Sequence, residues 1–443
     1  MAGGQWVAQN KVRPGVYINY KARPQPLGSL GDRGIAAYPA DLPWGDPNNV
    51  IVLEASEYAD NALKLLGFSP SDARIRHITA AVGQASTVLI YRLGGAGAVK
   101  ATVVHEALTI TAKWGGTRGN DLKVIIQSNI DNVDAFDVIT LLDGNEVDTQ
   151  LVESIDALQA NDFVVWSGTG VITATAGVAL TGGVDGTNSG EDLSDALSAF
   201  EGYQFNVLGV PLDDSTSKQL VVAYVKRQRD EEGKKIQAVL VNQPLADYEG
   251  IISLRNGVVT SDGLQVTPTS LVWEIAAMQA AANVNESLTY TAIPNAVDAF
   301  PRLTNSETIA ALRAGELVIT SLNGTAVIEQ DINTLTSFTP DRSRAFSKNR
   351  VMRVLDSIGN DVKRIFDAFY IGKVSNNADG RALLEAELVS YLLTLQGLGA
   401  IQNFDSQTDV SVAAGADVDS VVIELSIRPV DSIEKIYMTV EVV

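Results

Sequence analysis

The arrangement that most constrains this chain is an alternation of helix and strand patterns that stops near residue 96 and resumes near residue 187. On the N-terminal side, apolar periodicity predicts a helix over Ala55–Leu66 and a buried strand over Thr87–Leu93. On the C-terminal side, the pattern resumes with a helix over Glu191–Glu201. Strands that alternate with helices are typical of a parallel sheet covered by helices. We therefore predict one α/β domain, with a first part at residues 35–96 and a second part at residues 187–338.

Residues 97–186, between the two parts, are rich in Val, Thr, Ile and Gly, a composition that favours β-structure. One segment in this stretch, Val152–Ala160, has a helical pattern instead. Turn dipeptides such as Asp143-Gly144 separate runs with strand character, which are Ala107–Ala112, Leu122–Ser128, Phe136–Leu142, Phe163–Trp166 and Val171–Ala174. Because surface loops tolerate insertions, we predict a mostly-β domain inserted into the α/β domain.

Residues 339–435 are predicted to form an α+β domain. A long amphipathic helix over Ser347–Tyr370 comes first, and a second helix over Gly380–Gln396 precedes a strand over Val421–Arg428. The first helix is locally basic in a chain of net charge −20, through Lys348, Arg350, Arg353, Lys363 and Arg364. This basic face either points to solvent or docks an acidic partner, because complementary charge sets the register of an interface.

Both ends of the chain are predicted to be extended arms. Residues 1–34 contain Pro14, Pro24 and Pro26, which disfavour a helix or a central strand. Strand alternation occurs in both arms, at Val16, Tyr17, Ile18 and Tyr20 and, within residues 436–443, at Ile436, Met438, Val440 and Val442. A terminal strand needs a partner. It either completes the chain's own sheet or pairs with another subunit.

Composition argues against several classes of function. The net charge of −20 disfavours nucleic acid as a partner, and the absence of cysteine removes disulfides, thiolate metal sites and cysteine nucleophiles. The chain has only two histidines, His77 and His105, and no nucleophile motif or phosphate-binding loop. We therefore predict no enzymatic activity, no cofactor, no metal and, since no apolar run reaches the length of a bilayer span, no membrane insertion. The alternatives are a surface-binding β-rich module and an α/β hydrolase-type enzyme.

Several motifs, in order along the chain, carry a family resemblance. They are Arg13-Pro14-Gly15-Val16-Tyr17, the glycine-rich turn Trp114–Asn120, the stretch Glu329–Thr336, Lys348-Asn349-Arg350-Val351 and Tyr370-Ile371-Gly372-Lys373-Val374. With these motifs the sequence resembles the contractile tail sheath proteins of bacteriophages and phage-like particles, particularly those of Gram-positive hosts. The resemblance covers the whole chain and is weakest in the inserted domain.

The resemblance implies a structural subunit that stacks with itself in six-fold rings, as a helical homopolymer around an inner tail tube protein. Contraction of such a sheath drives the tube through a target cell envelope. The resemblance also implies baseplate and tail terminator proteins as partners, assembly in the host bacterial cytoplasm, and a place in the tail of the virion or phage-like particle. The arms would pair with sheets of neighbouring subunits, the inserted domain would face outward, and the basic helix of the inner C-terminal domain would face the tube.

Overall fold

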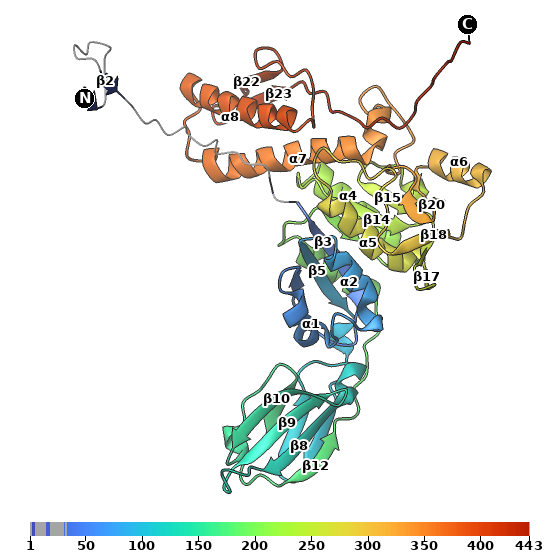
Figure 1. Ribbon diagram of the computed structural model, residues 1–443. Helices are drawn as coiled ribbons and strands as arrows, with labels where there is room; N and C mark the ends of the chain where they lie inside the picture. Colours follow the sequence, from blue (N-terminus) through green and yellow to red (C-terminus); the bar gives the residue numbers. More distant parts are fainter. Residues whose placement is uncertain (1, 5–14, 18–30, 32, 443) are drawn as a thin grey trace. The chain divides into compact units, whose positions relative to one another are not determined.

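The computed structural model describes residues 2–4, 15–17, 31 and 33–442 (Figure 1). The chain divides into two compact units, which are described separately below. The larger unit comprises Gly31–Asn360 and Pro429–Val443, and the smaller unit comprises Asp361–Arg428 together with the N-terminal segment Met1–Leu30. Within the described ranges, no helix has both the length and the hydropathy needed to cross a bilayer.

The larger unit is built on a seven-stranded sheet with the order β19-β15-β14-β13-β3-β5-β4. Its neighbouring strands are parallel except for β4, which runs antiparallel to β5. The strands are β3 (Ile35–Asp41), β4 (Ile51–Glu54), β5 (Thr87–Leu93), β13 (Val207–Gly209), β14 (Gln237–Val241), β15 (Ile251–Leu254) and β19 (Glu316–Leu317). Such a sheet must be covered on both faces, because its strands are nearly all apolar.

Helices cover both faces of this sheet. Alternation along β5 sends Ile90 into one apolar core and Leu89 into the other. The first core takes α1 (Tyr58–Leu66), α2 (Arg76–Val82) and α5 (Pro268–Ala281), and the second takes α3 (Gly190–Phe200) and α4 (Ser215–Asp230). The predicted α/β layer is therefore confirmed.

Local sequence signals define where these helices begin and end. Ser189 and Asp192 form a reciprocal capping box at the start of α3. Asp214 caps α4 by accepting a hydrogen bond from the Ser217 amide. Gly67 ends α1 in the left-handed conformation, with a φ of 76°, which costs glycine little.

Residues between β5 and α3 form an inserted β-sandwich, as predicted. One sheet has the order β10-β9-β8-β12 and the other the order β11-β7-β6. The strands are β6 (Thr102–His105), β7 (Leu108–Ala112), β8 (Leu122–Ser128), β9 (Phe136–Leu142), β10 (Asn145–Val152), β11 (Val164–Ser167) and β12 (Thr175–Ala179). Side chains such as Ile110, Leu122 and Val138 fill the apolar core between them.

Two predictions inside the sandwich are wrong. The expected helix Val152–Ala160 is instead the end of β10 followed by a single 3₁₀ turn at Ile155–Ala157. Ile155 and Leu158 have helical spacing, but both are buried beside the sandwich core. The expected strand Val171–Ala174 is shifted to Thr175–Ala179, where pairing with β8 contains a bulge.

The glycine-rich turn Trp114–Asn120 fixes the sandwich to the α/β layer. The guanidinium of Arg118 is 2% exposed, donates to the carbonyl of Gly67 at 2.7 Å, and forms two hydrogen bonds of 2.9 and 2.6 Å with Asp143. Arg92 on β5, also buried, donates to the carbonyls of Leu42 and Gly45 in the α/β layer and of Gly115 in the turn. Both arginines therefore link the sandwich to the α/β layer through buried hydrogen bonds.

The segments that enter and leave the sandwich run side by side. Val99 and Val184 exchange two backbone hydrogen bonds, of 2.8 and 3.1 Å. Next to this bridge, the two backbone segments are so close that a Cβ atom on Gly186 would collide with the carbonyl oxygen of Gly94. Glycine is required at this crossing because no other residue leaves room for the backbones.

Smaller elements complete the larger unit. A three-stranded sheet has the order β17-β16-β18, with β16 at Gly257–Thr260, β17 at Gln265–Val266 and β18 at Ala296–Phe300. The helix α6 (Asn305–Arg313) precedes the hairpin of β20 (Ile319–Leu322) and β21 (Thr325–Ile328). The turn of this hairpin, Asn323-Gly324, has positive φ at both positions, the conformation that an Asn-Gly pair favours in a two-residue hairpin turn.

The helix α7 (Asn349–Ile365) begins in the larger unit and ends in the smaller one. After it come a π-helical turn (Phe366–Tyr370), α8 (Ala378–Gly397) and the antiparallel hairpin of β22 (Val410–Ala414) and β23 (Val421–Leu425). Near the N-terminus, β1 (Ala2–Gly4) pairs in parallel with β2 (Gly15–Tyr17). β22 was missed in the sequence, because its Val and Ala residues are followed by an exposed polar turn and not by a strong hairpin signal.

Candidate functional site

The five basic residues predicted to face a partner lie in different environments along α7 and at its start. Arg353 is buried, Lys348 and Arg350 are half-buried, and Lys363 and Arg364 are exposed. Four of the five are on α7 itself, and Lys348 immediately precedes it. The basic face is therefore divided between side chains that hold α7 in place and side chains that reach solvent.

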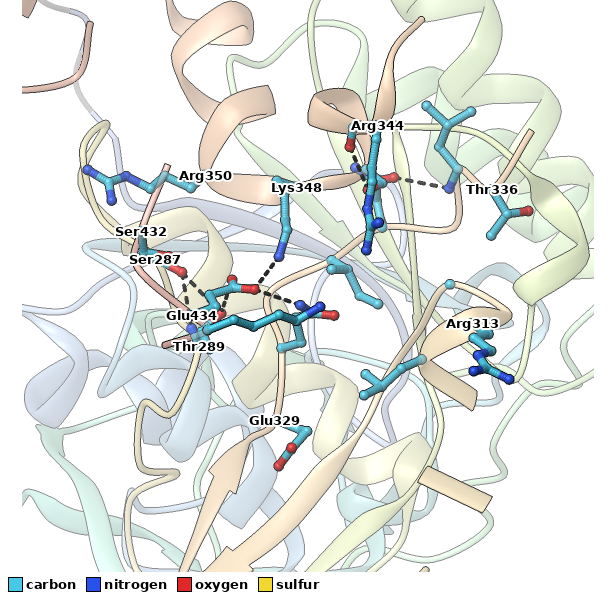
Figure 2. A pocket seen from close by; sticks show the side chains of 18 of the residues that line it. Ser287, Thr289, Arg313, Glu329, Thr336, Arg344, Lys348, Arg350, Ser432 and Glu434 are labelled. Carbon is cyan, nitrogen blue, oxygen red and sulfur yellow. Dashed lines mark hydrogen bonds and ion pairs between the residues drawn. The ribbon is translucent and has the colours of Figure 1, made fainter. Parts of the chain in front are cut away.

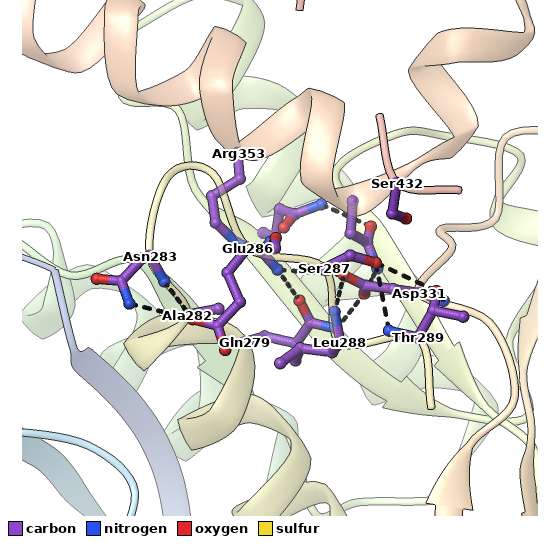
Figure 3. Close-up of polar contacts among 12 residues, drawn as sticks. Gln279, Ala282, Asn283, Glu286, Ser287, Leu288, Thr289, Asp331, Arg353 and Ser432 are labelled. Carbon is purple, nitrogen blue, oxygen red and sulfur yellow. Dashed lines mark hydrogen bonds and ion pairs between the residues drawn. The ribbon is translucent and has the colours of Figure 1, made fainter. Parts of the chain in front are cut away.

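Asp331 organises the packing of α7 against the larger unit (Figure 3). Its carboxylate is buried and accepts hydrogen bonds from Gln279 at 2.7 Å, Asn349 at 2.8 Å and the Leu288 amide at 3.0 Å. The side chain of Arg353 lies 3.4 Å from the same carboxylate. These donors satisfy the oxygens of a carboxylate that burial removes from water, which offsets the cost of burying it.

Arg353 is an internal part of this network. Its guanidinium, 1% exposed, donates to the side chain of Gln279 at 2.7 Å and to the carbonyl of Glu286. In this structure the charge of Arg353 is balanced by Asp331, so the side chain is not presented to a partner. The sequence motif that contains Asp331 contributed to the family resemblance, but the sequence alone did not assign this residue a role.

The first half of α7 has two further attachments to the α/β layer. Asp356 accepts two hydrogen bonds from Arg229 on α4, at 2.7 and 2.8 Å, in a buried ion pair. Asn360 exchanges hydrogen bonds of 2.8 and 3.0 Å with the backbone of Lys235. Together with Asp331, these contacts hold α7 along one side of the larger unit up to residue 360.

Beyond residue 360, the basic residues of α7 belong to the smaller unit. Lys363 pairs with Asp367 at 3.3 Å, with about half of each side chain exposed. Arg364 pairs with Asp361, whose other carboxylate oxygen accepts a 2.8 Å hydrogen bond from Tyr391 on α8. Lys363 and Arg364 are both exposed, with 48% and 44% of their side chains accessible to solvent.

A second polar cluster holds the segment Ser432–Lys435, which we call the arm root (Figure 2). Glu434 points inward from the arm root and is 12% exposed. Its carboxylate accepts hydrogen bonds from Thr289 at 3.0 Å and Gln330 at 2.6 Å, and it forms an ion pair with Lys348. These three residues belong to the larger unit, so Glu434 ties the arm root to its own subunit.

The environment of Glu434 favours its charged form. Burial alone raises the pKa of the carboxyl group, but the hydrogen bonds from Lys348 and Gln330 and the charge of Lys348 outweigh it. The pKa of Glu434 therefore lies below its usual value. Sequence reasoning missed this residue, because nothing in a short acidic and apolar segment distinguishes an inward-facing glutamate from a solvated one.

The C-terminal arm, residues 436–443, follows the arm root. The four side chains predicted to form its apolar face are 73–96% exposed, and they are Ile436, Met438, Val440 and Val442. No strand is formed over 436–442 in the isolated subunit. Large apolar side chains at this exposure are unusual on a free surface.

The predicted N-terminal strand residues fall only partly within the described ranges. Val16 and Tyr17 belong to β2, which pairs with β1 of the same chain. Ile18 and Tyr20 lie outside the described residues. The pairing of these four residues with another subunit remains a prediction.

Over the residues that the structure describes, no group of three or more His, Asp or Glu side chains is placed to hold a metal ion. His77 contacts the ring of Trp273 at 4.9 Å, and burial lowers its pKa to about 4, so it is neutral near pH 7.

Three family models match the chain in order. They describe the phage tail sheath protein β-sandwich domain at residues 94–185, the phage tail sheath protein central domain at residues 186–334 and the phage tail sheath C-terminal domain at residues 341–443. The first of these models coincides with the inserted sandwich.

Relatives agree with the family models. The chain is 34% identical over 470 residues to the phage-like element PBSX protein XkdK of Bacillus subtilis, with 100% of each covered. The solved sheath tail protein of Desulfitobacterium hafniense is 51% identical, with a TM-score of 0.85 over 96% of this chain and 99% of that one. The contracted helical sheath of the anti-feeding prophage has a TM-score of 0.58 at 12% identity, covering 97% of this chain and 99% of that one, a likeness of fold alone.

These matches extend over the inserted sandwich, the α/β layer and the C-terminal region alike. The chain belongs to the phage tail sheath protein family, and it is a structural subunit of a contractile tail sheath, in the tail of a phage or phage-like particle, and not an enzyme.

Proposed function

We propose that copies of this subunit stack as six-fold rings into a helical polymer around an inner tail tube, and that its contraction drives the tube through a target cell envelope. The polymer assembles in the host bacterial cytoplasm and ends on baseplate and tail terminator proteins. Its subunits are joined by the two extended arms, which pair with sheets of neighbouring copies. Contacts that repeat head to tail without closing generate helical assemblies of this kind.

The observation that carries this proposal is the C-terminal arm. Its apolar side chains alternate along the chain and are 73–96% exposed, although the arm root beside them is held by three hydrogen-bonding partners. An extended segment with one apolar face is suited to adding a strand to an exposed sheet edge. An arm that forms about five such ladder bonds at ~1 kcal/mol each contributes roughly 5 kcal/mol per contact.

The β22–β23 hairpin supplies a suitable acceptor in each subunit. In the part of the chain that the structure describes, this sheet holds only two strands. Two-stranded sheets are marginal by themselves and leave unpaired backbone groups at both edges. Strands donated by other copies complete such a sheet and join the subunits.

The proposed contact with the inner tube rests on the exposed part of α7. Of the five predicted residues, Lys363 and Arg364 reach solvent, whereas Arg353 is buried and Lys348 is paired with Glu434. Arg350 lies beside the arm root. We therefore assign contact with an acidic tube surface to Lys363 and Arg364.

Electron microscopy of assembled particles tests the arm. Deletion of residues 436–443 is expected to leave a folded subunit, by circular dichroism, that forms no sheath. Val440→Pro removes one backbone donor and is expected to weaken assembly strongly, whereas Val440→Thr keeps the strand and is expected to assemble. Normal sheaths from the deletion variant would contradict the proposal.

A further inference from the structure

We propose that the groove beside the arm root docks an acidic segment of a neighbouring copy of this chain. The proposal rests on the proposed function, because the departing arm is what brings that neighbour to the groove. It concerns a different surface, however, since the groove is built from side chains and not from a sheet edge.

The groove is a cavity of about 750 Å³ in the larger unit (Figure 2). The C-terminal end of α6, the segment from Glu329 to Phe338, the start of α7 and the arm root line it. Lys348 and Glu434, which form an ion pair, are both among the residues that line it. The cavity is therefore bounded by elements that the Glu434 contacts hold in place.

The charge of the groove is opposite to that of the whole chain. Its lining includes two carboxylates, Glu329 and Glu434, and five basic residues, Arg313, Arg344, Lys348, Arg350 and Lys435. Lys348 is neutralised by Glu434, but Arg313, Arg344 and Arg350 form no ion pair with any described residue. A local excess of positive charge in a protein of net charge −20 favours an acidic occupant.

Two buried polar atoms in the groove also lack a partner. Neither Nε of Arg350 nor Oγ of Ser432 makes a hydrogen bond within the described ranges, although both atoms are buried. Buried polar groups are nearly always satisfied in a complete structure. Arg350 and Ser432 both line the groove beside the arm root, so these unsatisfied donors indicate the end of the groove at which an acceptor group of the occupant would bind.

Apolar side chains at the rim define the second property of the occupant. Tyr290, Phe338 and Ile309 are 58%, 48% and 40% exposed. They line the same groove as Arg313, Arg344 and Arg350, a combination that matches a segment carrying an apolar side chain beside a carboxylate. Burial of such side chains around a charged contact strengthens the contact by excluding water.

The neighbouring copy is the occupant that the structure favours. The arm leaves the groove at Ile436 and, in the proposed sheath, immediately meets a second subunit. That subunit is acidic, with 53 Asp and Glu residues against 33 Lys and Arg. Its surface is therefore both adjacent to the groove and complementary to it in charge.

A charge-reversal pair with a matched control tests the inference. In the full-length chain, Arg313→Glu with Arg344→Glu is expected to raise the concentration needed for polymerisation about tenfold, as the loss of two interfacial charge pairs predicts. The control, Lys100→Glu with Lys123→Glu, makes the same change in net charge on exposed residues of the sandwich region. It is expected to alter the concentration needed for polymerisation by less than about twofold. Equal effects of the two pairs would overturn the inference.

Site-specific cross-linking identifies the occupant. Because the chain has no cysteine, Phe338→Cys provides a single thiol for a benzophenone label in the groove. Sheaths assembled from mixed unlabelled and ¹⁵N-labelled subunits are irradiated, and the linked peptides are identified by mass spectrometry. Mixed-isotope links to an acidic peptide of this chain are expected. Links only within one subunit, or only to the tube protein, would overturn the inference.

The two proposals fail in different ways. If the wild-type chain forms no sheath, the proposed function fails before the groove is tested. If sheaths form and the arm deletion abolishes them, but the groove yields no link between copies, the groove inference alone is wrong.

Discussion

Arg229 on α4 and Asp356 on α7 form two parallel hydrogen bonds, from Nη1 at 2.7 Å and Nη2 at 2.8 Å, to the two oxygens of one carboxylate. Both side chains are less than one-tenth exposed. Such bidentate pairing fixes orientation as well as distance. It therefore holds the first half of α7 in one position against the α/β layer.

Removal of one member of this pair is expected to be costly. Asp356→Ala leaves the Arg229 guanidinium buried with only the Ile236 carbonyl as a hydrogen-bond acceptor, and we expect a loss of about 3–5 kcal/mol in the free energy of unfolding. Asp367→Ala, which breaks the exposed pair with Lys363, is expected to cost less than about 1 kcal/mol. Urea denaturation of both variants measures the difference. Equal losses would show that the buried pair has no special role.

The attachment of the arm root is expected to weaken in acid. The pKa of Glu434 in the folded chain lies below its ordinary value of 4.5, so the attachment contributes fully above that pH and is lost as pH falls through the folded pKa. A fluorophore on Met438→Cys is expected to show falling anisotropy as the pH is lowered below 4.5. Glu434→Gln is expected to give low anisotropy at every pH.

Glu441→Gln is the control for this titration, because Glu441 is an exposed carboxylate on the arm itself. This variant is expected to keep the pH dependence of the wild type. An identical titration in the Glu434→Gln chain would show that another group releases the arm root.

Arg118→Lys tests the junction between the sandwich and the α/β layer. Lysine cannot reproduce the fork that reaches the Gly67 carbonyl and both oxygens of Asp143, so we expect a loss of roughly 2 kcal/mol. Hydrogen exchange followed by mass spectrometry is expected to show faster exchange in the turn at residues 114–120. Lys123→Arg, at an exposed position on β8, is the conservative control and is expected to leave exchange unchanged.

Charge reversal on the exposed end of α7 tests the tube contact. Lys363→Glu with Arg364→Glu is expected to give sheaths that polymerise without a tube or contract prematurely, because like charges would face each other at the tube surface. Electron microscopy of particles provides the measurement, with Lys100→Glu and Lys123→Glu as the charge-matched control. Extended particles of normal appearance from the α7 variant would contradict the assignment.

Sequence reasoning succeeded where local pattern and tertiary environment agree. The strands β5, β8 and β9 have the predicted bounds, because each is a short apolar or alternating run bounded by turn residues. The turn at Asn323-Gly324 and the end of α1 at Gly67 are local in the same way, since both depend on the conformational preferences of one or two residues.

Prediction from the sequence failed where the structure depends on residues far apart in the chain. β10 is a polar strand that stands at the end of the strand order β10-β9-β8-β12, and its last residue, Val152, begins a false helical pattern. Arg353 resembles the other basic residues of α7 in sequence, but Gln279 and Asp331, 74 and 22 residues away, make it an internal residue. The role of Glu434 was invisible because its partners, Thr289, Gln330 and Lys348, come from three separate segments.

The crossing of Gly94 and Gly186 has a practical consequence for engineering. The segments that enter and leave the sandwich lie side by side. The insertion therefore joins the α/β layer at two adjacent points, as a short closed loop would. A foreign domain whose own termini lie side by side can be grafted between these two glycines without stretching β5 or α3. A polymer of such subunits would display the grafted cargo at regular spacing, once for every copy of the chain.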